Sequence, residues 1–426
     1  MGRIKDRLYD ENPKHVKEFI EYSLQDVKTQ LCLAEYIIDT HIREDINLCV
    51  SLAQISARVF KHNFLKEDDC LIFPMTKGRT MAELSYHGGK NGFYLEQPEL
   101  IPDVYEIDVN SMYPHAMMEM PNFNHCDYYT SDDYESKYDG VYKISGFVKD
   151  SKYKIIPKHE FGLKENYFND TYIEDVCVTS YELRQALKDK LIELDKIEGY
   201  LVVIDKTASN PIQDYVKYFY EKKKNTPKED SNYLYYKLML NSLYGKFQQL
   251  TELYTEDARK DILQSFGFIP HGVDYINDGI ASRPETFWKA GGLYNPMVST
   301  LITGFARTYL YQLETEYEAF DSSTDSVKTV IKPKGCNKEL GGFDVKHFGD
   351  CLFIRNKLYL HFDEDYNISS YALHGFQGSP KQLYELWKTK TNIYSHLHMN
   401  KVRESLITGK TPLIMEEREK RLDIKW

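Results

Sequence analysis

The sequence lacks any apolar run of the ~18 residues that a membrane span needs, and its amino-terminal stretch, MGRIKDRLYDENPKH, lacks the hydrophobic core of a signal peptide. It also lacks CxxC pairs, because its seven cysteines are scattered at positions 32, 49, 70, 126, 177, 336 and 351. An odd number of cysteines without a pairing pattern favours a reducing compartment and buried free thiols over metal ligands. We therefore expect a soluble, cytoplasmic globular protein with no membrane partner.

An excess of positive charge is also lacking. The net charge of −11 argues against a protein that coats nucleic acid nonspecifically, since phosphate neutralisation needs Lys and Arg. Residues 217–247 are the exception, with seven lysines against three acids and a local balance of +4. This segment is either a phosphate-binding region or a solvated lysine face. The 35 tyrosines suit packing, and some suit stacking on bases.

The stretch that organises the chain is KLMLNSLYGKF, residues 237–247. At helical pitch Lys237, Asn241 and Tyr244 share one face, which places a cation, an amide and a phenol together. A lysine suits a phosphate, and a tyrosine followed by Gly245 offers a flat ring beside accessible backbone. The same spacing fits an amphipathic surface helix that stops at a glycine, so the flanking stretches must decide between the two.

Two further stretches each place an aspartate near a strand end. Residues 104–114, VYEIDVNSMYP, predict a strand and a turn, with Asp108 on the open face of the strand. Residues 320–332, FDSSTDSVKTVIK, predict a hairpin with Asp325 at its tip. Two carboxylates facing a lysine-bearing helix are the components needed for metal-assisted phosphoryl transfer. The carboxylates hold two Mg²⁺ ions, for which Mn²⁺ is a substitute, and the lysines neutralise a triphosphate.

DVNSMYP, KLMLNSLYG and STDS resemble, in this order, motifs A, B and C of the family B DNA polymerases. The middle motif is highly specific, whereas the outer two are short. Tyr86-His87-Gly88-Gly89 matches the Tyr-x-Gly-Gly motif of the protein-primed branch, found in small phages, linear plasmids and related mobile elements. Lys357-Leu358-Tyr359 matches its Lys-x-Tyr motif, and residues 293–308 resemble the helix before motif C. The resemblance covers nearly the whole chain.

The resemblance implies an α+β fold of the right-hand polymerase type, with palm, fingers and thumb, an antiparallel palm sheet and terminal-protein-region insertions. The implied regions are an exonuclease remnant (1–45), a first palm segment (46–119), an insertion contacting the priming protein (120–208), fingers (209–248), a second insertion forming a hairpin (249–292), a second palm segment (293–380) and a thumb (381–426). In residues 120–208 the sequence itself predicts mixed α/β structure, and residues 381–426 look helical.

The resemblance also implies roles by position. Asp108 and Asp325 are the catalytic acids and hold the metals, together with the backbone carbonyl of Val109. The nucleotide-binding residues are Tyr113, Lys223, Lys224, Lys237, Asn241 and Tyr244, and the residues that bind DNA or primer are Tyr86, Gly88, Gly89, Ser111, Gly245, Ser326, Lys357 and Tyr359. Helix register favours Lys223 over Lys224. Tyr113 occupies the position that packs under the incoming sugar, and simple burial in a turn is its alternative role.

Two departures from the family pattern affect activity. Residues 14–38 predict a helix on which Tyr22 and Asp26 match the family's Tyr-x-x-x-Asp exonuclease motif. The other exonuclease carboxylates are absent from this sequence, so we expect no proofreading; that region is lost or lies on a separate exonuclease chain. Motif C carries Ser323 where the family has its first Asp, and Asp321, about 6–7 Å along the same strand face, is expected to restore some of that charge.

The leading interpretation is a template-directed DNA polymerase that uses deoxynucleoside triphosphates and starts from the hydroxyl of a terminal protein. One alternative is a catalytically weak or silent relative that binds DNA or a partner as a replication factor. Another is an ordinary family B enzyme that extends only nucleic-acid primers. A primer-extension assay with Mg²⁺ separates the first two, and a free protein hydroxyl offered as primer separates the first from the third.

Overall fold

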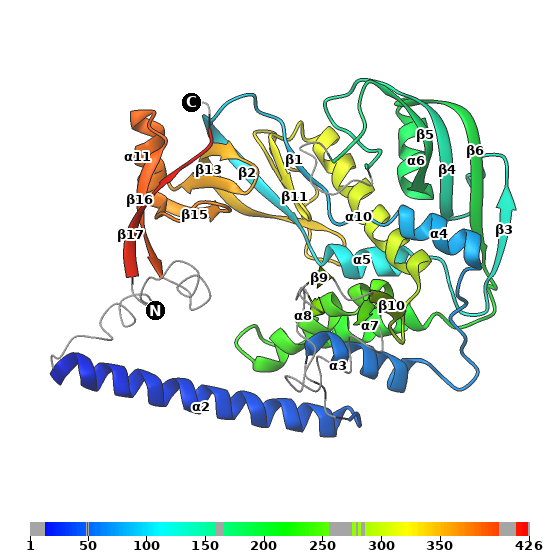
Figure 1. The fold of residues 1–426 in the computed structure, drawn as a ribbon, viewed down its shortest axis with the longest axis horizontal. Helices are drawn as coiled ribbons and strands as arrows, with labels where there is room; N and C mark the ends of the chain where they lie inside the picture. Colours follow the sequence, from blue (N-terminus) through cyan, green and yellow to red (C-terminus); the bar gives the residue numbers. More distant parts are fainter. Residues whose placement is uncertain are drawn as a thin grey trace.

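The computed structural model of the protein describes residues 13–47, 49, 51–158, 166–254, 275–277, 280–282, 286–399 and 415–424 (Figure 1). Within these ranges, no helix combines the length and the apolar character needed to cross a membrane.

A seven-stranded antiparallel sheet forms the centre of the molecule (Figure 1). Its order, β1-β11-β12-β2-β13-β14-β15, brings segments far apart in the chain side by side. The strands are β1 (Asn91–Phe93), β2 (Glu99–Val109), β11 (Asp321–Ser323), β12 (Ser326–Thr329), β13 (Phe343–Arg355), β14 (Leu358–Phe362) and β15 (Ile368–Leu373). The predicted strand around Asp108 and the predicted hairpin around Asp325 are confirmed, and β12 joins them by pairing with β2.

Two helices, α5 (Met112–Glu119) and α10 (Pro296–Glu316), pack beside this sheet. Ile107 of β2 and Leu310 of α10 belong to one buried apolar cluster. The predicted helix before motif C is α10, and it begins where the Asn295 side chain accepts a hydrogen bond from the backbone of its first turn. Because most side chains of α10 are buried, this helix is part of the core, and it packs against β12 of the sheet.

Two antiparallel helices, α7 (Pro211–Lys224) and α8 (Ser231–Ser242), form the predicted helical hairpin below α5 (Figure 1). Asn210 and Asp230 cap their amino termini. The helical pitch predicted from Lys237 to Tyr244 holds only as far as Ser242, where α8 ends, and a 3₁₀ turn, η2 (Tyr244–Gln248), follows it. The neighbouring helices are α3 (Leu52–Val59), the π-helical η1 (Phe60–Phe64) and α4 (Thr76–Leu84).

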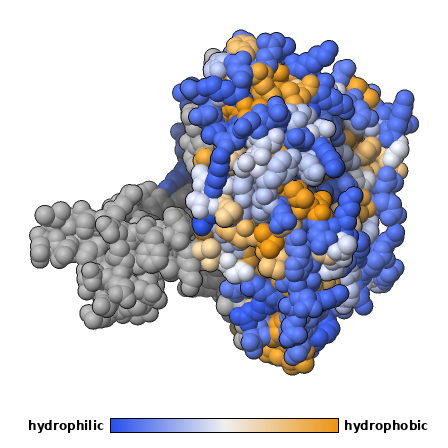
Figure 2. Space-filling model, turned by 90° about the vertical axis from the view of Figure 1, so that its right-hand side faces the viewer, coloured by the Kyte–Doolittle hydropathy of each residue, from blue (hydrophilic) through white to orange (hydrophobic). Residues whose placement is uncertain are grey.

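A four-stranded antiparallel sheet of order β3-β6-β4-β5 forms one end of the molecule. Its elements are β3 (Asp127–Ser131), β4 (Gly140–Val148), β5 (Thr171–Thr179), α6 (Ser180–Lys188) and β6 (Ile192–Val203), which confirms the mixed α/β prediction for this region. Figure 2 looks onto this end and shows apolar patches separated by hydrophilic residues. The helix α6 packs on α10, so this end is tied to the central core.

The remaining elements include a long helix, α2 (Pro13–Arg43), which extends beyond the predicted 14–38 at both ends. The prediction of a helical carboxyl-terminal segment is wrong. In the described residues of that segment only α11 (Pro380–Thr389) is helical, and it is followed by the antiparallel pair β16 (Ile393–Met399) and β17 (Met415–Arg421). The MEEREKR of β17 consists of good helix formers, and pairing with β16 overrides that propensity.

The segment predicted as the second insertion is described only in short strands. These are the pair β7 (Leu250–Tyr254) with β10 (Thr286–Ala290) and the pair β8 (Tyr275–Asn277) with β9 (Ile280–Ser282). The pair of β8 and β9 agrees with the hairpin predicted within residues 249–292, and residues 255–274, 278–279 and 283–285 lie outside the described residues.

Candidate active site

Asp108 and Asp325 lie next to each other on the central sheet. Asp108 stands one residue before the end of β2, directly across from Ser326 of β12. The Val109 N–H donates a 2.8 Å hydrogen bond to the Asp325 carbonyl oxygen. This bond ties the end of β2 to the tip of the hairpin formed by β11 and β12, so the two predicted acids come from one rigid corner of the sheet.

Burial and a neighbouring negative charge perturb both carboxyl groups, with Asp108 acting on Asp325 and Glu106 acting on Asp108. Burial, followed by the charge of Asp108, raises the pKa of Asp325 to about 6. Burial also raises the pKa of Asp108, and the charge of Lys346 opposes that rise. Two partly buried carboxyls that repel each other form an arrangement that a bound cation relieves.

Lysines from three different elements face the two acids. The Nζ atom of Lys346 on β13 lies 3.6 Å from Oδ1 of Asp108. Lys237 of α8, which is exposed, stabilises the charged form of Asp108 and so acts against the rise of its pKa. Lys357, in the turn between β13 and β14, does the same for Asp325. Cations from three elements therefore flank the acids, an arrangement that suits an anionic substrate.

Lys223 points toward this group, and Lys224 does not. The Nζ atom of Lys223 donates a 2.9 Å hydrogen bond to Oγ of Ser111, which begins α5 just beyond the end of β2. Lys224 instead pairs with Glu339 at 3.2 Å. Burial and then repulsion from Lys237 lower the pKa of Lys223, so an anionic ligand would favour its charged form.

Three tyrosines gather beside the acids. Tyr113 of α5 and Tyr244 of η2 stack with ring centroids 4.2 Å apart and planes 3° from parallel. Burial, and then the nearby phenol of Tyr244, raise the pKa of Tyr86. Asn241 and Gly245, at the end of the same helical segment, are exposed. This cluster presents flat rings next to a polar, accessible edge, as the sequence predicted for a nucleotide pocket.

The Tyr-x-Gly-Gly segment is held between the motif C turn and α10. A Cβ at Gly89 would lie 2.9 Å from Cγ2 of Thr324, so only glycine fits there without a shift. Arg307 of α10 is fully buried, donates to the Gly88 carbonyl at 3.1 Å and pairs with Glu182 of α6 at 2.7 Å. One buried cation thus links the four-stranded sheet region to the loop beside Asp325.

Lys346 and Arg307 were not predicted from the sequence. Lys346 stands in a β-bulge between Val345 and His347, and bulges redirect side chains from the regular alternation of a strand. No local sequence pattern predicts such a bulge. Arg307 lies within the helix resemblance, but its burial against Glu182 depends on packing between segments more than a hundred residues apart.

One expectation for a side chain near the acids is wrong. Asp321 does not restore the charge lost at Ser323, because its carboxylate is fully buried and accepts hydrogen bonds from Lys328 at 3.1 Å and Asn356 at 2.7 Å. Tyr359 of the Lys-x-Tyr motif has its ring 4.1 Å from Nζ of Lys328, on the neighbouring section of the sheet. Its contact with a primer stays a prediction.

A divalent cation is the group that this fold type implies for the two acids. Among the residues that the structure describes, no group of three His, Cys, Asp or Glu side chains is arranged to hold a metal. Two carboxylates still fit Mg²⁺, which uses one or two protein carboxylates and completes its shell with water and substrate phosphates. Burial, and then the charge of Asp108, raise the pKa of Asp325 to about 6, and a bound cation would favour the charged form of this carboxyl.

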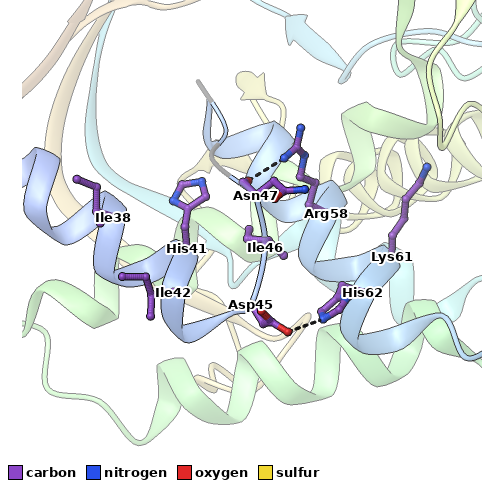
Figure 3. A pocket seen from close by; sticks show the side chains of 9 residues that line it. All are labelled: Ile38, His41, Ile42, Asp45, Ile46, Asn47, Arg58, Lys61 and His62. Carbon is purple, nitrogen blue, oxygen red and sulfur yellow. Dashed lines mark hydrogen bonds and ion pairs between the residues drawn. The ribbon is translucent and has the colours of Figure 1, made fainter.

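A separate cavity of about 880 Å³ lies where α2 meets α3 (Figure 3). Its lining includes the basic side chains of Arg58, Lys61 and His62. Asp45 pairs with His62 at 3.4 Å, and Arg58 donates to the Asn47 carbonyl at 2.8 Å. Neither predicted acid lines this cavity, so it is distinct from the site described above.

The antiparallel central sheet, the helical hairpin and the two acids define a right-hand polymerase fold. The structure superposes on phi29 DNA polymerase complexed with primer-template DNA and incoming nucleotide substrates with a TM-score of 0.64 at 16% identity, covering 98% of this chain and 73% of that one. A second phi29 polymerase structure, complexed with single-stranded DNA, gives 0.60 at 16% identity over 91% of this chain and 69% of that one. The predicted fold class is confirmed.

Residues 3–266 match the family model described as DNA polymerase type B, organellar and viral, and the chain belongs to this family. The resemblance to its protein-primed branch that the motifs indicated is confirmed. A probable DNA polymerase of Agaricus bitorquis is 24% identical over 82% of this chain and 49% of its own length. The DNA-directed DNA polymerase of Enterobacteria phage PRD1 is 25% identical over 67% of this chain and 50% of its own. The chain spans about half the length of these curated relatives.

Proposed function

We propose that the chain is a template-directed, DNA-dependent DNA polymerase that acts in the cytoplasm of its host cell. The single observation that carries the proposal is the convergence of Asp108 and Asp325 with the lysines of α7 and α8. Carboxylates that hold hard cations, next to lysines that hold phosphates, suit nucleotidyl transfer. Family membership supports the same reaction class.

In this proposal Asp108 and Asp325, with the Val109 carbonyl, hold two Mg²⁺ ions. When bound, these ions lower the pKa of the attacking hydroxyl and offset charge on the reacting phosphate. Lys223 and Lys237 bind the triphosphate, while Tyr113, Asn241 and Tyr244 shape the nucleotide pocket. The remaining residues bind template and primer; they include Tyr86, Gly88, Gly89, Ser111, Gly245, Ser326, Lys357 and Tyr359.

A primer-extension assay with Mg²⁺ and the four deoxynucleoside triphosphates tests the proposal. The rival interpretation is a silent relative that binds DNA as a replication factor, and the serine at position 323 beside only two acids favours it. Template-dependent extension that disappears in Asp325→Asn supports polymerisation. DNA binding without extension under either Mg²⁺ or Mn²⁺ supports the rival.

We also propose that synthesis starts from the hydroxyl of a terminal protein. The four-stranded sheet region, residues 127–203, stands where the resemblance expects an insertion that contacts such a partner. The measurement is the covalent transfer of a labelled deoxynucleotide to a candidate priming protein, with a DNA primer as the reference. A chain that extends DNA primers but never labels a protein would be the ordinary, nucleic-acid-primed type.

Replacing Tyr113 by Val is expected to relax selection against ribonucleotides. Tyr113 stacks on Tyr244 with parallel rings, so its side chain is held rigidly at the edge of the pocket, and removing the ring opens space for a 2′-hydroxyl. The measurement is kcat/KM for a ribonucleotide relative to its deoxynucleotide, and we expect the ratio to rise by roughly tenfold or more. Tyr172→Val, which truncates an exposed tyrosine of β5 outside the proposed pocket, serves as the control and should leave the ratio unchanged. An unchanged ratio would assign Tyr113 to packing alone.

Within these 426 residues we propose synthesis without proofreading. Asp26 is the one carboxylate in an exonuclease-like setting, and two metals need several ligands. A separate exonuclease chain is proposed to dock on α2 at Val16, Phe19 and Ile20. Of these three side chains the structure describes Ile20, which is exposed together with Leu24, Val27 and Leu31 on the same helix; the side chains of Val16, Phe19, Tyr22 and Asp26 lie outside the described residues. Labelled single-stranded DNA with Mg²⁺ should stay intact, and 3′ digestion that Asp26→Ala abolishes would contradict this.

A further inference from the structure

Two neighbouring rows of residues cross β11, β12, β2 and β13, and the antiparallel register sets both of them. The first row, which carries one proposed metal-binding acid, is Ser323, Ser326, Asp108 and Asp344. The second row is Asp321, Lys328, Glu106 and His347; it lies two residues along β11, β12 and β2, roughly 6–7 Å away, and three residues along β13 because of the bulge at Lys346. Residues directly opposite in an antiparallel pair share a sheet face. A line of alternating charge therefore runs beside the proposed metal site.

We call Asp321, Lys328 and Glu106 the charged row. Lys328 is its centre: Nζ lies 3.1 Å from Oδ2 of Asp321 on one neighbouring strand and 3.6 Å from Oε1 of Glu106 on the other. The ring of Tyr359 lies 4.1 Å from the same nitrogen. One ammonium group thus contacts side chains from β11, β2 and β14, three strands that are far apart in the sequence.

Two members of the charged row are shielded from water, and the third, Glu106, has a side chain that is 12% exposed. Asp321 is 0% exposed and Lys328 is 1% exposed. The second oxygen of Asp321 accepts a 2.7 Å hydrogen bond from Asn356, and the second oxygen of Glu106 lies 3.4 Å from Nε2 of His361. Burial alone would lower the pKa of Lys328, but Asp321 and Glu106 raise it above its usual value, so this side chain is a cation.

A buried cation between two carboxylates holds strands at a fixed spacing, because any separation leaves charges without a partner in a medium of low dielectric constant. The strands that Lys328 joins are the ones that carry the two acids. Asp108 is two residues beyond Glu106 on β2, and Asp325 follows β11 at the tip of the hairpin. A slip at the charged row therefore moves the acids relative to each other.

We propose that Lys328 is a positioning residue that sets the distance between Asp108 and Asp325 by clamping β11 and β2 to β12. The catalytic aspect of this inference rests on the proposed polymerase function. The clamp itself is a property of the fold and has a readout that needs no activity. The ion cluster also gives the Asp321 carboxylate a role, because this carboxylate is the partner of Lys328.

The central test compares Lys328→Met with Lys328→Arg. Methionine keeps the length of the side chain and removes the charge, whereas arginine keeps the charge. Lys328→Met should lower kcat for nucleotide incorporation at least about tenfold per folded molecule, with the nucleotide KM within about twofold, because the acids move while the triphosphate lysines do not. Lys328→Arg should retain most of kcat. Equal kcat in wild type and Lys328→Met would overturn the proposal.

A triple variant, Lys328→Met with Asp321→Asn and Glu106→Gln, tests whether charge balance is the cause. It removes the cation together with both carboxylates, so no buried charge is left unpaired. It should be more stable than Lys328→Met and should recover some of the lost kcat. If it is as defective as the single variant, charge balance is not the cause and the proposal fails. If Lys328→Met does not fold, the kcat values of the triple variant and of Lys328→Arg test the proposal in its place.

Hydrogen exchange tests the clamp by a measurement that does not depend on catalytic activity. The amide of Val109 donates to the Asp325 carbonyl, so its protection reports on the contact between the two acid-bearing segments. A peptide covering the end of β2 should exchange faster in Lys328→Met than in wild type. Lys149→Met, which removes an exposed lysine paired with Glu193 on the other sheet, should leave that exchange unchanged. If the exchange rate of this peptide is the same in Lys328→Met and in wild type, the proposal that Lys328 clamps the strands is wrong. If the exchange rates differ as expected but the wild type does not extend primers, only the proposed polymerase function is contradicted.

Discussion

Asp325→Asn and Asp108→Asn are each expected to abolish nucleotide incorporation while leaving DNA binding nearly intact. The carboxamide keeps the shape of the side chain and loses the charge that holds a hard cation. Losing several kcal/mol of transition-state stabilisation corresponds to a rate loss of roughly a thousandfold or more. The measurement is single-turnover extension of a labelled primer, with binding of the same duplex measured in parallel.

Asp344→Asn is the matched control, because Asp344 stands directly across from Asp108 in β13 and shows no comparable link to Asp325. It should retain most of the activity. If Asp325→Asn still incorporates nucleotides, Asp325 is not a catalytic acid. If duplex binding falls as much as the rate does, the substitution damages the fold.

The same substitution carries a prediction about stability. Because the folded pKa of Asp325 is raised to about 6, the folded protein binds this proton more tightly than the unfolded chain does. The stabilisation from the protonated carboxyl is present at low pH and is lost as the pH rises through about 6. Without metal, Asp325→Asn should therefore unfold at a higher temperature than wild type at about pH 7.5, and the two should converge near pH 4. Added Mg²⁺ or Mn²⁺ should raise the wild-type unfolding temperature more than that of the variant.

The second large effect is expected at Lys223. Its Nζ donates to Ser111 beside the end of β2, and burial together with Lys237 leaves its charge only partly compensated. A triphosphate supplies that compensation, so Lys223→Ala should raise the nucleotide KM or lower kcat. A lost charge-assisted contact is worth about 1.5–3 kcal/mol, which is roughly a 10- to 150-fold loss in kcat/KM.

Lys224 is the control that the structure supplies. It is the next residue on the same helix, it is exposed, and it pairs with Glu339 on the surface. Lys224→Ala should change kcat/KM by less than about threefold, since surface ion pairs contribute little. Steady-state kinetics over a range of nucleotide concentrations decide the matter. Equal losses in the two variants would indicate a general effect of charge on DNA binding instead of a specific contact.

The same pair of lysines shows what sequence reasoning can and cannot do at this site. Motif spacing found Asp108, Asp325 and the motif B helix, because short-range periodicity controls strand ends and helix faces. Motif spacing made Lys223 and Lys224 nearly equal candidates for the triphosphate contact, since both lie in the last turn of α7. Only the packing of α7 against α5, which brings Ser111 within 2.9 Å, separates them.

Asp321 is the clearest case in which strand alternation misled. Alternation correctly placed it on one strand face with Ser323, and the short spacing made it look like a substitute ligand. What the sequence could not supply was the partner: Lys328 and Asn356 take up both carboxylate oxygens and withdraw this charge from the acids. A side chain's role depends on which strands flank it, and this sheet order, β11-β12-β2, joins segments more than 200 residues apart.

The sequence by itself determined the family, the order of the motifs, the strand that ends at Asp108, the hairpin that presents Asp325 and the helical hairpin that brings lysines toward them. These features follow from local periodicity, capping and turn residues, which act within a few residues of the chain. The tertiary structure alone decided that Lys346 reaches Asp108 through a bulge, that Arg307 and Lys328 are buried cations, and that the MEEREKR segment is a strand. Each of these depends on a partner distant in sequence, and the free energy of burying or pairing a charge is set by that partner and not by its neighbours along the chain.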